Sequence, residues 1–132
     1  MFSSPVRVIG MAAAAAALAV GFSSSAQAVP DTMDAPYAQA AARIHADGTI
    51  RASKGIDTVT HPRTGVYCVS FTKNLNLPQT APQATVESDD FGVITVITTP
   101  YGWCNNEQGT LSLLIRGQDG ARKDLPFTLA IP

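Results

Sequence analysis

The sequence predicts a single all-β domain, an antiparallel β-sandwich or small barrel of about seven to eight short strands after an N-terminal signal helix. Short apolar runs rich in Val, Ile and Thr recur along residues 38–132, and Gly, Pro, Asn and Asp separate them. The whole chain has 132 residues, which suits one hydrophobic core and is too short for two. Its two cysteines suit a single disulfide in such a fold.

Residues 1–28 have the pattern of a cleavable secretory signal peptide. Arg7 precedes an apolar run from Val8 to Phe22, and Ala26-Gln27-Ala28 forms a cleavage site of small residues. This run is too short for a membrane anchor, because a spanning helix needs about 20 apolar residues. We therefore expect a mature chain that begins at Val29, is secreted to the extracellular space and is not stably inserted in a membrane.

Residues 29–37 are expected to form a flexible leader, because they contain two prolines and two acidic residues without an apolar period. The single domain then covers residues 38–132. The chain has 9 Lys and Arg against 10 Asp and Glu, and the cations are scattered. Nucleic acid is not an expected partner, because binding driven by phosphate contacts needs a concentrated basic surface.

The first predicted hairpin turns through the loop Ala46–Gly48. A loop of this length places Ile44 opposite Ile50 on the core face, whereas a two-residue loop would mix polar and apolar side chains. The same register places Arg43 opposite Arg51 on the solvent face, where they splay apart or pair with an acid. The glycine of the loop takes the left-handed conformation that such turns require.

A second hairpin is predicted near the C-terminus, with Gln118–Gly120 as its loop and its glycine also left-handed. This register places Leu113 opposite Leu125 and sorts the apolar positions to one face. It also places Leu111 opposite Phe127.

The alternating residues from Leu125 to Ile131 form the clearest strand signal in the chain. Pro126 cannot donate a backbone hydrogen bond, so this strand is expected at a sheet edge or with that position turned to solvent.

Between the hairpins, Val66–Phe71 is apolar on nearly both faces and is predicted to be a central strand. Its expected neighbours are strands over 84–88 and 93–98, joined through Asp89-Asp90-Phe91-Gly92. A further short strand is expected over 56–60, and loops are expected over 73–82 and 101–106.

Cys68 and Cys104 are expected to form a disulfide, because an exported protein meets oxidising conditions. Their spacing is not C-x-x-C, and with His45 and His61 they do not show zinc-ligand spacing. No cofactor or metal is expected.

The segments Ala42–Ile50, Gly55–Thr60 and Thr64–Phe71 resemble a β-rich module of small, uncharacterised secreted actinobacterial proteins, which is similar to modules near the ends of phage tail-fibre-like proteins. The resemblance extends to the closing aspartate-glycine turn and to Asp124–Leu129. Its motifs are turn glycines and core apolar residues, so it implies a fold and no catalytic residues.

The aromatic pair Tyr101 and Trp103, beside Cys104, provides the candidate binding residues. A rigid exposed ring can stack on a sugar or anchor a protein, whereas the favoured alternative is that Trp103 covers the core over the disulfide. Catalytic motifs such as G-x-S-x-G are absent from the sequence, and His45 and His61 are expected to be incidental surface residues.

These observations favour a non-enzymatic module that binds a protein or a surface glycan. The alternative is a secreted hydrolase whose catalytic residues are dispersed along the sequence. Neither the partner nor the oligomeric state follows from the residues.

Overall fold

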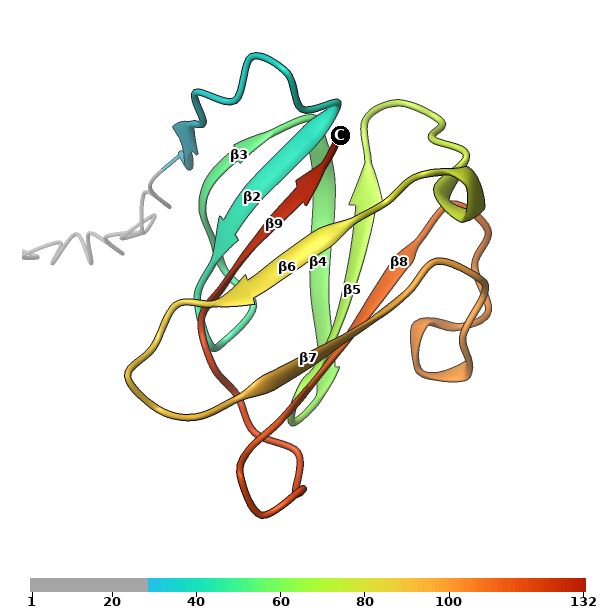
Figure 1. Cartoon of the computed structure of the whole chain (residues 1–132). Coiled ribbons are helices and arrows are strands. Elements are labelled where there is room, and N and C mark those ends of the chain that lie inside the picture. The colour runs from blue at the N-terminus through green and yellow to red at the C-terminus, as the bar shows by residue number, and fades with distance from the viewer. Residues whose placement is uncertain (1–28) are drawn as a thin grey trace, which may run out of the picture.

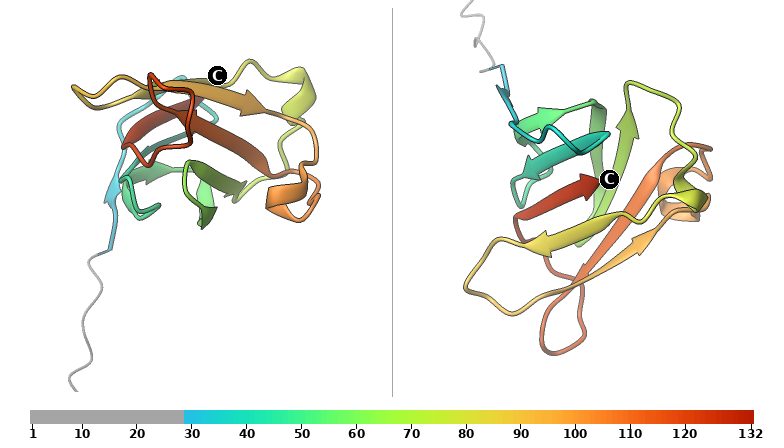
Figure 2. Two further views of the ribbon diagram at one scale, coloured as in Figure 1. Left: turned by 90° about the horizontal axis from the view of Figure 1, so that it is seen from below. Right: turned by 45° about the horizontal axis from the view of Figure 1, so that its top comes forward.

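The computed structural model describes residues 29–132, so the expected signal peptide lies outside the described part of the chain. Two sheets stack face to face, and neither sheet closes on itself (Figures 1 and 2). All strand pairs are antiparallel except the short pair of β1 with β3. The prediction of an all-β sandwich is therefore confirmed, and the barrel alternative is not adopted. No helix in this part of the chain is long and apolar enough to span a membrane.

The first sheet has the order β1-β3-β2-β9-β6 and consists of β1 (Asp31–Thr32), β3 (Ile50–Lys54), β2 (Ala40–Ile44), β9 (Phe127–Ile131) and β6 (Gln83–Val86). The second has the order β4-β5-β8-β7 and consists of β4 (Ile56–Arg63), β5 (Val66–Phe71), β8 (Leu111–Arg116) and β7 (Val93–Ile97). The consecutive strands β6 and β7 lie next to each other at one side of the sandwich, one in each sheet (Figures 1 and 2). Two 3-10 turns, η1 (Leu77–Gln79) and η2 (Gly102–Cys104), interrupt the connections.

The core lies between the sheets and is filled by the inward side chains of alternating strand positions. In β9, every second residue is buried, as expected for a strand with one face on the core. Tyr67 and Phe127 are the largest fully buried side chains, and their rings meet edge to face with centroids 4.9 Å apart. The contact between Tyr67 and Phe127 links the centres of the two sheets.

The first hairpin has the predicted three-residue loop, with Ile44 opposite Ile50 and Gly48 at a φ of 88°. The expected pairing of Arg43 with Arg51 is wrong, because a β-bulge shifts the register and places Arg43 opposite Ala52. The bulge separates the two like charges.

The second hairpin is confirmed only at its turn, where Gly120 has a φ of 76°. Gly117 N–H donates to Ala121 O, after which the chain leaves the second sheet and enters the first. Leu113 therefore pairs with Tyr67 of β5 and not with Leu125, and Leu111 likewise pairs with β5 and not with Phe127.

The last strand, β9, is central, since it lies between β2 and β6. Of the two alternatives expected from Pro126, an edge strand or a position turned to solvent, the edge strand is wrong. Pro126 is partly exposed and precedes the strand, and its carbonyl accepts from Glu87 N–H at 2.8 Å. The central position of β5 is confirmed, but its neighbours are β4 and β8 rather than the two strands expected. The predicted short strand at residue 56 continues through His61 and Pro62 to Arg63.

The leader is attached to the sheet at Asp31–Thr32, which pairs in parallel with β3. The ammonium of Lys54 donates to the carbonyls of Ala35 at 2.7 Å and Ala38 at 2.8 Å. Part of the segment predicted to be flexible is thus bonded to the domain.

Candidate functional site

The loop of residues 98–110, between β7 and β8, is held on the outer face of the second sheet by the predicted disulfide. Cys68 of β5 and Cys104 of η2 are bonded, with Cα atoms 5.6 Å apart, and both are buried. The turn around η2 is closed locally, because Cys104 N–H donates to Tyr101 O at 3.0 Å. The predicted disulfide is confirmed. This bond attaches the loop that carries Tyr101 and Trp103 to β5.

Trp103 is exposed over 39% of its surface. Trp103 is therefore not fully buried, and its interpretation as a lid over the disulfide stays a prediction, which the stability of Trp103→Ala tests. The guanidinium carbon of Arg63 lies 3.8 Å from the centroid of the indole ring, and that of Arg122 lies 5.8 Å from it. Tyr101 is half-buried at the other end of the same short turn.

The turn continues through two asparagines in the left-handed conformation, Asn105 with a φ of 57° and Asn106 with a φ of 50°. Asparagine tolerates this conformation better than most residues, but two in succession still cost conformational free energy. Such strain persists only where the surrounding structure fixes the backbone, and here the disulfide does so.

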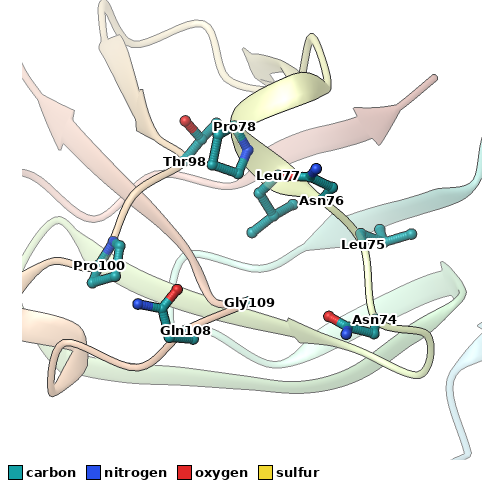
Figure 3. A pocket seen from close by; sticks show the side chains of 9 residues that line it. All are labelled: Asn74, Leu75, Asn76, Leu77, Pro78, Thr98, Pro100, Gln108 and Gly109. Carbon is teal, nitrogen blue, oxygen red and sulfur yellow. The ribbon is translucent and has the colours of Figure 1, made fainter.

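Figure 3 shows a hollow between the 98–110 loop and the 72–82 loop, with a volume of about 500 Å³. Its rim carries the amide side chains of Asn74, Asn76 and Gln108, and buried Leu77 lies among them. The other lining residues are Leu75, Pro78, Thr98, Pro100 and Gly109. All of these side chains are uncharged, so the hollow offers hydrogen-bonding groups without a fixed charge.

A second hollow of about 170 Å³ lies between Trp103 and the outer faces of β4 and β5. Four of its ten lining residues carry hydroxyl groups, and these are Thr58, Thr60, Ser70 and Thr110. Asn105 and Glu107 add an amide and a carboxylate. A third, open hollow is lined by Tyr101, Gly102 and Trp103. Trp103 thus stands between two hollows, and the same loop borders all three.

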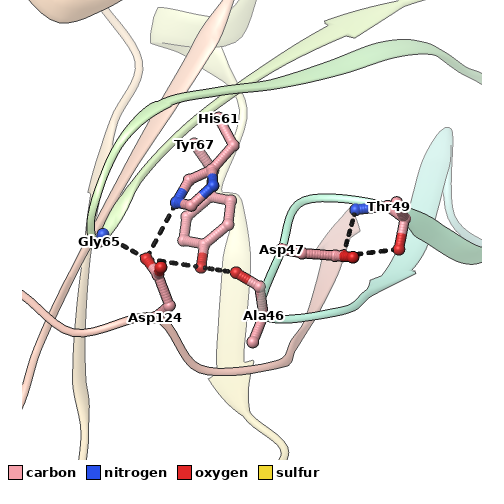
Figure 4. A network of polar contacts seen from close by, with 7 residues as sticks. All are labelled: Ala46, Asp47, Thr49, His61, Gly65, Tyr67 and Asp124. Carbon is pink, nitrogen blue, oxygen red and sulfur yellow. Dashed lines mark hydrogen bonds and ion pairs between the residues drawn. The ribbon is translucent and has the colours of Figure 1, made fainter.

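At a different place in the fold, a polar network surrounds one oxygen of Asp124 (Figure 4). Asp124 Oδ1 accepts from Gly65 N–H at 2.6 Å and is 2.9 Å from His61 Nε2. The Tyr67 hydroxyl donates to Ala46 O at 2.6 Å and lies 3.4 Å from the same carboxylate oxygen. The network joins the first hairpin, the β4–β5 turn and the β8–β9 connection.

The rings of His61 and Tyr67 stack with centroids 4.5 Å apart and an angle of 11° between their planes. Burial, followed by the charge of Asp124, raises the pKa of Tyr67 well above its ordinary value of 10.0. Tyr67 therefore remains a neutral donor. His61 belongs to this network and is only partly exposed, so the expectation that it is incidental is wrong, whereas His45 is exposed.

Sequence reasoning missed this network, although several of its members belong to the motifs on which the family resemblance rests. The groups of the network come from three turns that are far apart in the sequence, and the sequence does not show that these turns lie close together in space. Thr49 makes a separate local contact: its hydroxyl donates to Asp47 Oδ1 at 2.6 Å, and its N–H donates to the same oxygen. These bonds, the hydroxyl first, lower the pKa of Asp47 below its usual 3.8.

His61 also lines a hollow of about 620 Å³ together with His45, Asp47 and Thr49. A histidine beside an acid supplies part of a hydrolytic site, but no serine hydroxyl within residues 29–132 hydrogen-bonds to a histidine. Across the same residues, no group of three or more His, Cys, Asp or Glu side chains could hold a metal ion. Asp90, in the connection between β6 and β7, lies 3.3 Å from the ammonium of Lys123.

The chain was compared with protein-family models, with curated proteins and with solved structures, and none of the three comparisons finds a match.

Proposed function

We propose that the protein acts outside the cell as a non-enzymatic binding module, and that the 98–110 loop presents its contact surface for a glycan or a protein. The observation that carries this proposal is the partly exposed Trp103 on a loop that a disulfide fixes to β5. A ring that is rigid before binding loses little conformational entropy when a ligand covers it. Aromatic residues in such positions supply much of the binding free energy at interfaces.

The three hollows around the loop support a polar ligand with many hydroxyl or amide groups. Their linings contain amide and hydroxyl side chains that can both donate and accept hydrogen bonds. A surface glycan offers such groups at high density, and so does the rim of a protein interface. The glycan is the preferred ligand because the polar groups lie in shallow concave sites.

The experiment is retention of the purified protein on cell-surface polysaccharide and on surface protein fractions, each immobilised separately. Trp103→Ala is expected to abolish retention on one of the two supports. It should lower the free energy of unfolding by less than the roughly 3–5 kcal/mol expected for a fully buried tryptophan. The matched control is Phe91→Ala, which removes another exposed ring, on the β6–β7 connection. Equal retention of both variants would contradict the proposal.

The alternative function, a hydrolase with dispersed residues, is favoured by one observation: the His61–Asp124 contact at the edge of the 620 Å³ hollow. Hydrolysis of ester, glycoside or peptide substrates that is lost in His61→Gln but retained in Trp103→Ala would support it. The absence of turnover in the wild-type protein, combined with retention that depends on Trp103, would favour binding.

A further inference from the structure

We propose that the ligand of the 98–110 loop is an acidic saccharide, and that Arg63 and Arg122 bind its carboxylate beside Trp103. This inference rests on the proposed binding function and names the chemical class of the ligand. Two guanidinium groups from different turns approach one indole ring, at 3.8 Å and 5.8 Å from its centroid. Arg63 ends β4, and Arg122 follows the 117–121 turn and forms a backbone bridge with Arg116.

Neither guanidinium has an acidic partner in the part of the chain that the structure describes. The ion pairs there are Arg43–Glu87, His61–Asp124 and Lys123–Asp90. Nor does the side chain of Arg63 or Arg122 donate a hydrogen bond to another residue between 29 and 132. Two neighbouring cations without counter-charges create a local positive potential that favours an anion.

Arg122 supplies a second, independent observation. Its Nη1 atom has no exposed surface and no hydrogen-bond partner among the described residues. A buried donor without an acceptor is unfavourable, and native proteins leave few such groups unsatisfied. A ligand oxygen that draws this guanidinium toward the surface would supply the acceptor that the folded chain does not provide.

The stacking of Arg63 on Trp103 determines how the anion binds. Because the guanidinium lies against the ring, one face of the indole is occupied by protein and is not free for a sugar ring. The N–H groups of a stacked guanidinium point outward in its own plane, where a carboxylate can accept two of them at once. Trp103 is therefore a positioning residue for Arg63 in this site, and the charged contact gives specificity.

The adjoining hollow favours a saccharide over an acidic peptide. Its hydroxyl groups and the amide of Asn105 match the alternating donors and acceptors of sugar hydroxyls. Glu107 lines the same hollow and would repel a second carboxylate there, but it can accept from a sugar hydroxyl. The charges thus orient the ligand, with its acid group toward the arginines and its hydroxyl groups toward Glu107.

The test uses the fluorescence of Trp103, which is the only tryptophan of the chain. Oligogalacturonate is expected to change its emission in a saturable titration, and methyl-esterified oligogalacturonate is expected to bind at least about tenfold more weakly. Arg63→Gln and Arg122→Gln should each weaken binding of the acid about tenfold or more. The matched control is Arg51→Gln, which removes an equal charge from an exposed position of β3. Thermal melts of the three variants verify that they fold.

Equal binding of the acid and the ester, with retention still dependent on Trp103, would overturn this inference and leave the proposed function intact. Binding of poly-glutamate as tight as that of oligogalacturonate would overturn the saccharide assignment. If no saccharide changes the emission and Trp103→Ala changes no retention, both proposals fail.

A measurement without ligand tests the charge environment itself. Relative to the quenching of free N-acetyltryptophanamide by the same ion, iodide should quench Trp103 more strongly than caesium at equal ionic strength, because the two guanidinium groups concentrate anions near the ring. Removal of both arginines should abolish this difference. Equal relative quenching by the two ions in the wild-type protein would overturn the proposed anion site.

Discussion

Asp124 Oδ1 shows how a single oxygen atom can hold three turns together. It accepts from the backbone of Gly65 and contacts His61, and it lies near the hydroxyl of Tyr67, which in turn donates to Ala46. The bonds join segments of both sheets at one end of the sandwich (Figure 4). Hydrogen bonds to a charged group contribute more than neutral ones, so this contact set stabilises the fold where its loops meet.

The two turn glycines are predicted to differ in their tolerance of a side chain. Both have positive φ, which disfavours alanine by roughly 1 kcal/mol. A Cβ on Gly48 would also lie 2.9 Å from His61 Cβ, whereas one on Gly120 would meet nothing within 4 Å. Urea melts should therefore show a larger loss of stability for Gly48→Ala than for Gly120→Ala. Equal losses would contradict the close contact between the first hairpin and His61.

At the scale of elements, Glu87 connects three strands of the first sheet. It follows β6, its carboxylate accepts from the hydroxyl of Thr128 in β9 at 2.6 Å, and it pairs with Arg43 in β2 at 2.9 Å. The Thr128 bond and then the Arg43 bond hold the pKa of Glu87 below its ordinary value of 4.5. Glu87 is thus the acidic partner of Arg43 on the solvent face of the sheet.

We expect this contact to stabilise the protein near neutral pH and to be lost in acid. Because the pKa is lowered by folding, the stabilisation is present above pH 4.5 and disappears as the pH falls through the folded value. Glu87→Gln should cost up to about 1 kcal/mol at pH 7, since the pair is partly exposed. Urea melts of both proteins should converge as the pH is lowered below 4.5 and through the folded-state pKa of Glu87. A difference that stays constant with pH would exclude the charge as its cause.

The disulfide is predicted to support both stability and binding. Cys68 and Cys104 are separated by 36 residues, and closing a loop of this length stabilises the fold by about 4 kcal/mol in the chain-entropy model. The double variant Cys68→Ala, Cys104→Ala should lose roughly that amount in urea melts. Under conditions where circular dichroism shows that the sheets remain folded, it should also lose retention on the ligand of the 98–110 loop. Undiminished retention would show that the loop does not need its covalent anchor.

At the scale of the molecule, the β class and both glycine turns were predictable because they depend on local patterns, and the disulfide was predictable because the chain has only two cysteines. The pairing partner of each strand was not predictable. The alternation of Leu111 and Leu113 with Leu125 and Phe127 fits a hairpin within one sheet as well as a crossover between two sheets. Nothing in the local sequence distinguishes these arrangements, because both bury the same side chains.

The candidate site was predictable in part. The aromatic pair and its covalent anchor follow from the spacing of Tyr101, Trp103 and Cys104. The guanidinium of Arg122 does not, because it reaches the ring only after the chain has turned at residues 117–121 and crossed back toward β4. Exposure of Trp103 likewise depends on which turns gather around it.

The large sequence separation between paired strands also predicts slow folding. β2 pairs with β9 and β5 pairs with β8, so the central ladders join residues far apart in sequence. Domains dominated by such pairs fold in about milliseconds to seconds, more slowly than small helical proteins. Stopped-flow refolding with the disulfide intact should give a main phase in this range. A main phase within microseconds would contradict the strand pairing described above.

The long interval between β2 and β9 has a consequence for biogenesis. While the chain emerges from a ribosome or a translocation pore, β2 can pair with β3 early, but its other edge stays open until residues 127–131 arrive. Such an edge is a template for pairing with other chains. Only Arg43 carries a charge within β2, and the three alanines before it, Ala40, Ala41 and Ala42, carry none. Until the last strand arrives, the nascent chain therefore leaves this edge of β2 open to pairing with other chains.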